Sequence, residues 1–457
     1  MKTRISDDQR RTIYEMLDAG ASRDAISVKA GLTPGQVSAV AAHRTMRANE
    51  SRARTSALVA PASREKAFGT TKENSSVGTF AIPLGHDSSD NLISWDPSKA
   101  SNPHVLVVGE SGSGKTYTVS RLAIELANRG VPSIVFDYGQ GFALTSEAAV
   151  LDEDNLLKKL DLGAHGISVN PLEIFSSDLL GPLTVAQRVA DTFLRVYPKL
   201  GVQQHSLLRK AVLDLFSDCG IAGDDKQSWT RRAPSFKELE SKIREIEKEG
   251  TSSERRAATT LASHISTIFF FDTFRRSGLT LGWSDLLQNG HQLWILKLNG
   301  LEDSVEKAVT EFLLWNLLRF FESIGPGPLR CYIVLDEAHR LAMSEGSPVE
   351  RLLREGRKFG IGVILASQQP EDFTSVAYTN TATKLAFQLF DTNGRVVKQL
   401  RQRALEGMSG EKLLKAVSTL PRGSAYVVTS QSSAIVDLFS YEEARAHSAA
   451  TNQRKSR

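Results

Sequence analysis

Short apolar runs alternate along the chain with longer stretches in which apolar residues recur every three or four positions. The short runs predict buried strands, and they fall at 92–95, 105–108, 133–136, 292–298, 331–335, 361–366, 384–388 and 423–429. The three- and four-residue spacing predicts helices at 116–129, 186–197, 204–216, 236–247, 254–270 and 305–324. Strands that alternate with helices indicate an α/β fold, with a mostly parallel sheet covered by helices on both faces. The helices between about 160 and 280 are expected to form an insertion into it.

Residues 1–46 predict a small all-α head. An apolar stripe ends at Gly20, a second helix starts near Ser22 with Ile26 inward, and Thr33-Pro34 opens a third helix through His43. Two helices joined by a short glycine-containing turn are typical of a helix-turn-helix. The third helix would then offer DNA the side chains of Gln36, Ser38, Ala39, His43 and Arg44. The alternative is a three-helix packing module that binds no DNA.

Composition divides the rest of the chain. Residues 47–78 are rich in Arg, Lys, Ser, Ala and Thr and predict a basic flexible linker. Residues 79–445 form the expected core, and 446–457 a polar tail. The 56 Lys+Arg and 52 Asp+Glu residues leave a net charge of only +4, so any surface for a polyanion must be local. No apolar run approaches the ~20 residues of a membrane helix, so we expect a cytoplasmic protein, or one held at a membrane only through partners.

The stretch G-E-S-G-S-G-K-T has the spacing of a phosphate-binding loop. Its glycines let backbone amides converge on phosphates at a helix N-terminus, Lys115 adds a positive charge, and the Thr116 hydroxyl is a magnesium ligand. The expected nucleotide-binding residues are Gly109, Glu110, Ser111, Gly112, Ser113, Gly114, Lys115, Thr116 and Tyr117.

An apolar run that ends in Asp336 and Glu337 supplies the second half of such a site. Asp336 would hold the Mg²⁺ shell, and Glu337 would polarise the attacking water. The adjacent glutamate favours ATP hydrolysis over a GTPase switch or a kinase.

Two further segments carry polar residues suited to catalysis. The strand at 361–366 leads to Gln368, which would contact the γ-phosphate. Before it lies a charged cluster, in which Arg354 or Arg357 is expected to act as an arginine finger in a neighbouring subunit. A solvated charged face is the alternative for this cluster.

Together G-E-S-G-S-G-K-T, I-V-L-D-E-A-H-R and L-L-R-E-G-R-K-F-G-I-G-V-I-L-A-S-Q-Q-P resemble the HerA/FtsK superfamily of motor ATPases, over residues of about 80–440. The resemblance implies a RecA-like P-loop core, ATP and Mg²⁺, and self-association into a ring, expected to be a hexamer. By the same resemblance Asp137 matches an acid behind the γ-phosphate, although the His-Gly-Glu that often follows is Tyr138-Gly139-Gln140 here.

The resemblance also shapes the expected function. The stretch before the phosphate loop is too short for the β-barrel usual in HerA proteins, and the membrane helices usual in FtsK and conjugative coupling proteins are missing. We therefore expect an ATP-driven translocase or helicase on duplex DNA, with a separate nuclease or effector partner in repair or defence. Alternatives are a conjugation or type IV secretion motor and a nucleotide-switched DNA-binding regulator.

Overall fold

The computed structural model describes a defined part of the chain, and every structural statement below concerns these residues: 12, 16, 23–31, 80–139, 142, 156–275, 282–288, 293–341, 343–390, 410–430 and 432–447. The chain forms two compact units, Met1–Val77 and Gly78–Arg457.

In the first unit the described helix is α2, Arg23–Ala30. Ile26 is fully buried, as the helical pattern predicts, and Gly31 follows with φ +63°, a left-handed conformation that suits the end of a helix. The expected DNA contacts Gln36, Ser38, His43 and Arg44 lie outside the described residues, so the helix-turn-helix stays a prediction.

The second unit is built on an 11-stranded sheet of order β2-β1-β11-β10-β9-β3-β8-β7-β4-β6-β5. The strands are β1 Ile82–Asp87, β2 Leu92–Trp95, β3 Val105–Val108, β4 Ser133–Asp137, β5 Leu157–Asp161, β6 Leu293–Lys297, β7 Cys331–Leu335, β8 Ile361–Ser367, β9 Thr383–Ala386, β10 Ser424–Val428 and β11 Ser433–Leu438. From β9 to β5 neighbouring strands run parallel, whereas β9, β10, β11, β1 and β2 pair antiparallel. The expected α/β class with a mostly parallel sheet is confirmed.

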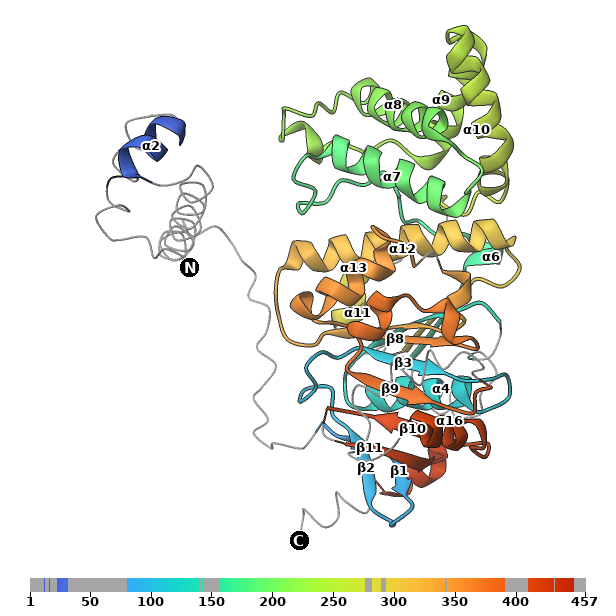
Figure 1. The fold of residues 1–457 in the computed structure, drawn as a ribbon. Coiled ribbons are helices and arrows are strands. Elements are labelled where there is room, and N and C mark those ends of the chain that lie inside the picture. The colour runs from blue at the N-terminus through green and yellow to red at the C-terminus, as the bar shows by residue number, and fades with distance from the viewer. Residues whose placement is uncertain are drawn as a thin grey trace. The chain divides into compact units, whose positions relative to one another are not determined.

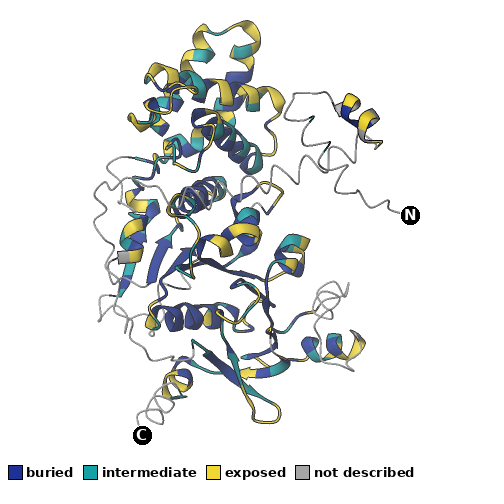
Figure 2. Ribbon diagram, turned by 90° about the vertical axis from the view of Figure 1, so that its left-hand side faces the viewer, coloured by how far each residue is buried: buried dark blue, intermediate teal, exposed yellow. Residues whose placement is uncertain are grey.

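Helices cover both faces of the sheet because alternate side chains of each strand point to opposite sides. Val105 and Val107 of β3 pack in one core with α4, Lys115–Asn128. Leu106 and Val108 pack in the other core, which contains α12, Asp303–Ile324. Figure 2 shows the central strands and α4 dark blue, while the outer helices carry much exposed surface.

The predicted helical insertion lies between β5 and β6 and stacks on α12 (Figure 1). Its helices are α6 Leu162–His165, α7 Pro182–Val196, α8 Val202–Asp218, α9 Phe236–Glu249 and α10 Ser252–Phe270. Because α12 lies between the sheet and the insertion, its residues are buried on almost every side, the polar Glu306, Glu311 and Asn316 included. Its Phe312 packs against Phe193 of α7 and Phe236 of α9, with ring centroids 5.7 and 5.6 Å away.

The remaining helices are short: α11 Trp283–Gln288, α13 Pro348–Glu355, α14 Ser375–Thr379 and α16 Gly410–Ser418. None of the helices formed by the described residues combines the length and the apolar composition that crossing a bilayer requires.

Candidate nucleotide-binding and hydrolysis site

The loop between β3 and α4 is shaped by its glycines. Gly109 has φ +159°, and a Cβ built on it would lie 2.5 Å from Cβ of Phe387, closer than packed atoms allow. Gly114 has φ +111° and caps α4 without a side chain, so the first amides of the helix gain no side-chain acceptor from it. Such a helix N-terminus is suited to bind an anion.

Lys115 is buried at this helix start, and its Nζ donates to the carbonyl oxygen of Glu110 over 2.7 Å. Burial lowers the pKa of Lys115, while the nearby carboxylates of Asp336, Glu110 and Glu337 oppose that shift. A buried ammonium is stabilised by an anionic partner. The loop and Lys115 together therefore fit the phosphates of a nucleotide.

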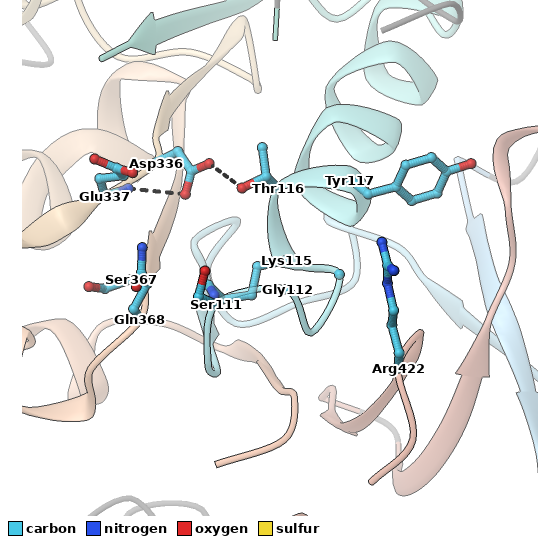
Figure 3. Close-up of a pocket in the computed structure, with 11 residues that line it drawn as sticks. Ser111, Gly112, Lys115, Thr116, Tyr117, Asp336, Glu337, Ser367, Gln368 and Arg422 are labelled. Atoms are coloured by element: carbon cyan, nitrogen blue, oxygen red, sulfur yellow. Dashed lines mark hydrogen bonds between the residues drawn. The ribbon is translucent and has the colours of Figure 1, made fainter. Parts of the chain in front are cut away.

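The acidic side of the site comes from β7, which ends one residue before Asp336. The Thr116 hydroxyl donates to Oδ2 of Asp336 over 2.8 Å, and the Glu337 amide donates to its Oδ1 over 3.0 Å (Figure 3). Burial raises the pKa of Asp336, partly offset by the Thr116 hydrogen bond. A hydroxyl and a carboxylate that already meet at this point are the hard oxygen donors that Mg²⁺ prefers. The residues present therefore fit a bound Mg²⁺.

These groups line one cavity of about 320 Å³ at the carboxyl ends of β3, β7 and β8. Its lining residues are Ser111, Gly112, Gly114, Lys115, Thr116, Tyr117, Asp336, Glu337, Ser367, Gln368 and Arg422. In open parallel sheets ligands bind at this edge.

Comparison with known sequences agrees with this geometry. The profile of the family described as "Helicase HerA, central domain" matches residues 82–317. The chain belongs to this family.

Relatives of this HerA-family chain are distant. The DNA double-strand break repair helicase HerA of Saccharolobus solfataricus is 24% identical over 340 residues, which are 71% of this chain and 61% of that protein. The DNA import protein CedB of Sulfolobus acidocaldarius is 25% identical over 310 residues, 64% of this chain and 45% of that protein. The chain thus spans about three fifths of the length of the first of these relatives.

Solved structures share the fold. VirB4 of Thermoanaerobacter pseudethanolicus superimposes with a TM-score of 0.63 at 16% identity, covering 78% of this chain and 96% of that chain. The plasmid coupling protein TrwB in complex with the ATP analogue ADPNP gives 0.52 at 16% identity, covering 74% of this chain and 87% of that chain. The fold is therefore that of RecA-like P-loop ATPases.

Of the two further residues expected in the site, Gln368 lines the cavity and Asp137 does not. Gln368 follows β8 directly, is exposed and lines the cavity. Asp137 ends β4, the strand beside β7, and is buried without lining the cavity. Burial raises the pKa of Asp137, and the charge of Asp336 adds to the shift. Asp137 thus follows the strand next to the one that Asp336 follows and does not line the cavity, so its role as an acid behind the γ-phosphate stays a prediction.

The structure does not bring the two expected finger arginines to the chain's own cavity. Arg354, the penultimate residue of α13, is exposed and pairs with Glu350 at 2.9 Å. Arg357 is exposed in the 3₁₀ helix Gly356–Phe359 and donates to the carbonyl oxygen of Ser101. Neither side chain lines the cavity of its own chain.

Sequence reasoning missed Arg422, which lines the cavity at the end opposite Asp336 and Glu337 (Figure 3). It stands beside Tyr117, whose hydroxyl accepts a hydrogen bond from the Tyr441 amide over 2.9 Å. The turn that carries Arg422 reaches the loop because the Gly423 amide donates to the carbonyl oxygen of Ser113 over 3.2 Å. The sequence around Arg422, just before β10, carries no motif that would predict this contact.

Proposed function

We propose that the chain is a Mg²⁺-dependent ATPase. The observation that carries this proposal is the hydrogen bond of Thr116 to Asp336, with Glu337 directly after it, beside a phosphate-binding loop. It joins the two halves of a hydrolytic site from opposite parts of the sequence.

Each residue of the site has a defined task in this proposal. The loop amides and Lys115 bind the β- and γ-phosphates, while Thr116 and Asp336 hold Mg²⁺. Bound Mg²⁺ neutralises charge that develops on the phosphate oxygens. Glu337 accepts the proton of the attacking water, and Gln368 hydrogen-bonds the γ-phosphate. Asp137 is the proposed acid behind the γ-phosphate.

We propose further that the chain works as a ring, expected to be a hexamer, in which Arg354 or Arg357 reaches the nucleotide of a neighbour. In support, both side chains are exposed and lie outside their own cavity. A head-to-tail ring brings such a surface of one subunit to the cavity of the next.

The substrate that this proposal assigns to the ring is duplex DNA. The relatives that carry a helicase name and the DNA import protein support it. The predicted head and the basic linker of residues 47–78 would recruit DNA through phosphate contacts. A nuclease or effector protein is the proposed partner, in repair or in defence.

A conjugation or type IV secretion motor is the second candidate, because the chain shares its fold with VirB4 at a TM-score of 0.63. That likeness shows the fold alone, so substrate dependence must separate the two proposals.

The test is steady-state phosphate release with Mg²⁺ and ATP, measured without DNA and with short and long linear duplexes. Turnover that rises with duplex length supports the DNA motor. Turnover that ignores DNA contradicts it and favours the secretion motor, and no turnover under any condition contradicts the ATPase proposal. The same assay is run on Glu337→Gln, which removes the proposed catalytic base and should lose turnover. Its control is Glu249→Gln, which removes an exposed acid of α9 and should turn over like wild type.

A further inference from the structure

Arg340 connects the proposed catalytic base to another part of the fold. It ends the 3₁₀ helix Ala338–Arg340, which follows Glu337. Its Nε donates to Oε2 of Glu337 over 2.8 Å, and its Nη1 donates to Oε2 of Glu306 over 2.7 Å. One guanidinium group therefore bridges a carboxylate of the site and a carboxylate of α12.

On the α12 side, this bridge is buried and has several contacts. Glu306 is buried in the first turns of α12, and Asp303 of the same helix lies 3.6 Å from Nη1 of Arg340. The guanidinium group also lies over the Tyr138 ring, 5.8 Å from its centroid, and the Tyr138 hydroxyl is 3.1 Å from the Thr310 hydroxyl of α12. The planar fork of an arginine holds two partners in a fixed geometry. Arg340 therefore contacts α12 as well as Glu337 of the site.

Glu337 is held by this contact in an unusual conformation. Its φ of +64° is left-handed, which is uncommon for a residue with a side chain. In Figure 3 its carboxylate points away from Thr116 and Lys115, on the far side of Asp336. An oxygen that accepts a charge-assisted hydrogen bond from arginine is a poorer acceptor for a water proton.

We propose that Arg340 is a positioning residue that restrains Glu337 in a resting orientation, anchored to α12, and that a shift of α12 releases the carboxylate toward the attacking water. This inference rests on the proposed ATPase function and adds a means of regulating it. Arg340 touches neither the phosphate loop nor the metal ligands in the described structure, so it acts through Glu337.

The helical insertion also contacts α12, so a movement of the insertion could shift α12 and release Glu337. Arg195 of α7 pairs with Glu311 of α12 at 2.8 Å, and the Ser304 hydroxyl of α12 donates to the Tyr197 hydroxyl over 3.3 Å. A displacement of the insertion by a bound partner or a neighbouring subunit would move α12 and, with it, the anchor of Arg340. The proposed latch consists of Glu337, Arg340 and Glu306.

The test compares phosphate release by wild type, Arg340→Gln and Glu306→Gln without DNA. We expect Arg340→Gln to raise the DNA-free kcat about tenfold, with little change in KM, because one charge-assisted hydrogen bond is removed. Glu306→Gln, which keeps the side-chain shape and loses one anchor, should give a smaller rise. The double variant Arg340→Gln/Glu337→Gln should have the same kcat as Glu337→Gln alone, because the gain depends on the Glu337 carboxylate.

The matched control is Arg129→Gln, which removes another half-buried arginine paired with a buried glutamate, Glu125, at the far end of α4. Its kcat should equal that of wild type. A DNA-free kcat of Arg340→Gln and Glu306→Gln at or below wild type, at equal melting temperature, overturns the latch. An inactive wild type contradicts the proposed function instead, so the two failures are distinguishable.

Discussion

The acids of the proposed site lie together inside the chain's own cavity, whereas the two arginines are exposed outside it. Thr116 and Asp336 come from distant parts of the sequence, yet they meet at 2.8 Å within one chain. Arg354 and Arg357 lie only a few residues before β8, yet they face outward.

In the proposed ring, this difference assigns the acids and the arginines of one catalytic site to two neighbouring subunits. Metal binding and water activation need groups fixed within about an ångström, and a sheet edge supplies that rigidity. Stabilisation of transition-state charge can come from a neighbour, so that hydrolysis occurs only after assembly. His104 belongs to the arginine side of this comparison, since it lies just before β3, its Nδ1 accepts a hydrogen bond from the Val363 amide near the start of β8, and the charge of Arg357 acts on it.

The largest expected effect comes from the outward arginines. The double variant Arg354→Ala/Arg357→Ala should lose about a thousandfold in kcat, the lower range for an arginine finger. Nucleotide binding by isolated subunits should persist, because neither side chain lines the cavity. Lys358→Ala, which removes an exposed cation of the same segment, is the control. A double variant with wild-type kcat would show that the segment is only a solvated face.

The next largest loss of kcat is expected at Glu337, the proposed catalytic base. Glu337→Gln should lower kcat by about a hundredfold or more, the range for a general base. Binding of a fluorescent ATP analogue should stay within about twofold of wild type, because the phosphate loop and Mg²⁺ ligands are intact. If binding falls as far as turnover, Glu337 serves the structure of the site and not the chemistry.

His104 makes the stability of the fold near Arg357 sensitive to acid. Burial, with the charge of Arg357, lowers the pKa of His104 from its ordinary 6.5 to about 4. The unfolded chain therefore takes up the proton first, so the contribution of this group to stability is lost as pH falls from about 6.5 to about 4. The full loss is about 3 kcal/mol.

Urea unfolding at several pH values measures this loss. His104→Gln should unfold with a free energy that falls less between pH 7 and pH 4 than that of wild type. Equal pH dependence in the two proteins would mean that His104 is accessible to protons when folded.

The smallest effect is expected at the end of the cavity away from the acids. Tyr117→Ala and Arg422→Ala should each raise KM for ATP about tenfold with less change in kcat, because both residues line the cavity away from the acids, where the proposal places the part of the nucleotide that does not react. Tyr117→Phe keeps the ring and should be milder than Tyr117→Ala. A fall in kcat at unchanged KM for Arg422→Ala would instead place this arginine at the reacting phosphate, as a finger within the same chain.

The sequence predicted the parallel centre of the sheet well. The runs that became β3, β7 and β8 are continuous and apolar because both their faces are buried, and each ends in the polar residues of the site. The predicted helices of the insertion also match α7 to α10 within a few residues.

The elements and residues that the sequence did not predict depend on contacts between distant segments. β1 and β11 pair antiparallel although Asp87 and Val436 lie at opposite ends of the core sequence. β5 is an edge strand with the half-buried Lys158 and the exposed Lys159, so it lacks a continuous apolar run. The charged cluster before β8 hid the amphipathic helix α13, whose Leu352 and Leu353 are buried. Arg422 reaches the cavity through a turn whose position only the folded sheet defines.

The measurement that tests the shared site most directly is turnover by a mixture of two inactive proteins, Glu337→Gln and Arg354→Ala/Arg357→Ala. In a mixed ring, some interfaces join an intact acid to intact arginines of the neighbour. We predict that a one-to-one mixture regains up to about a quarter of wild-type turnover, the share of such interfaces in a randomly assembled ring. A mixture no more active than its separate components, although mixed rings form, would contradict the account.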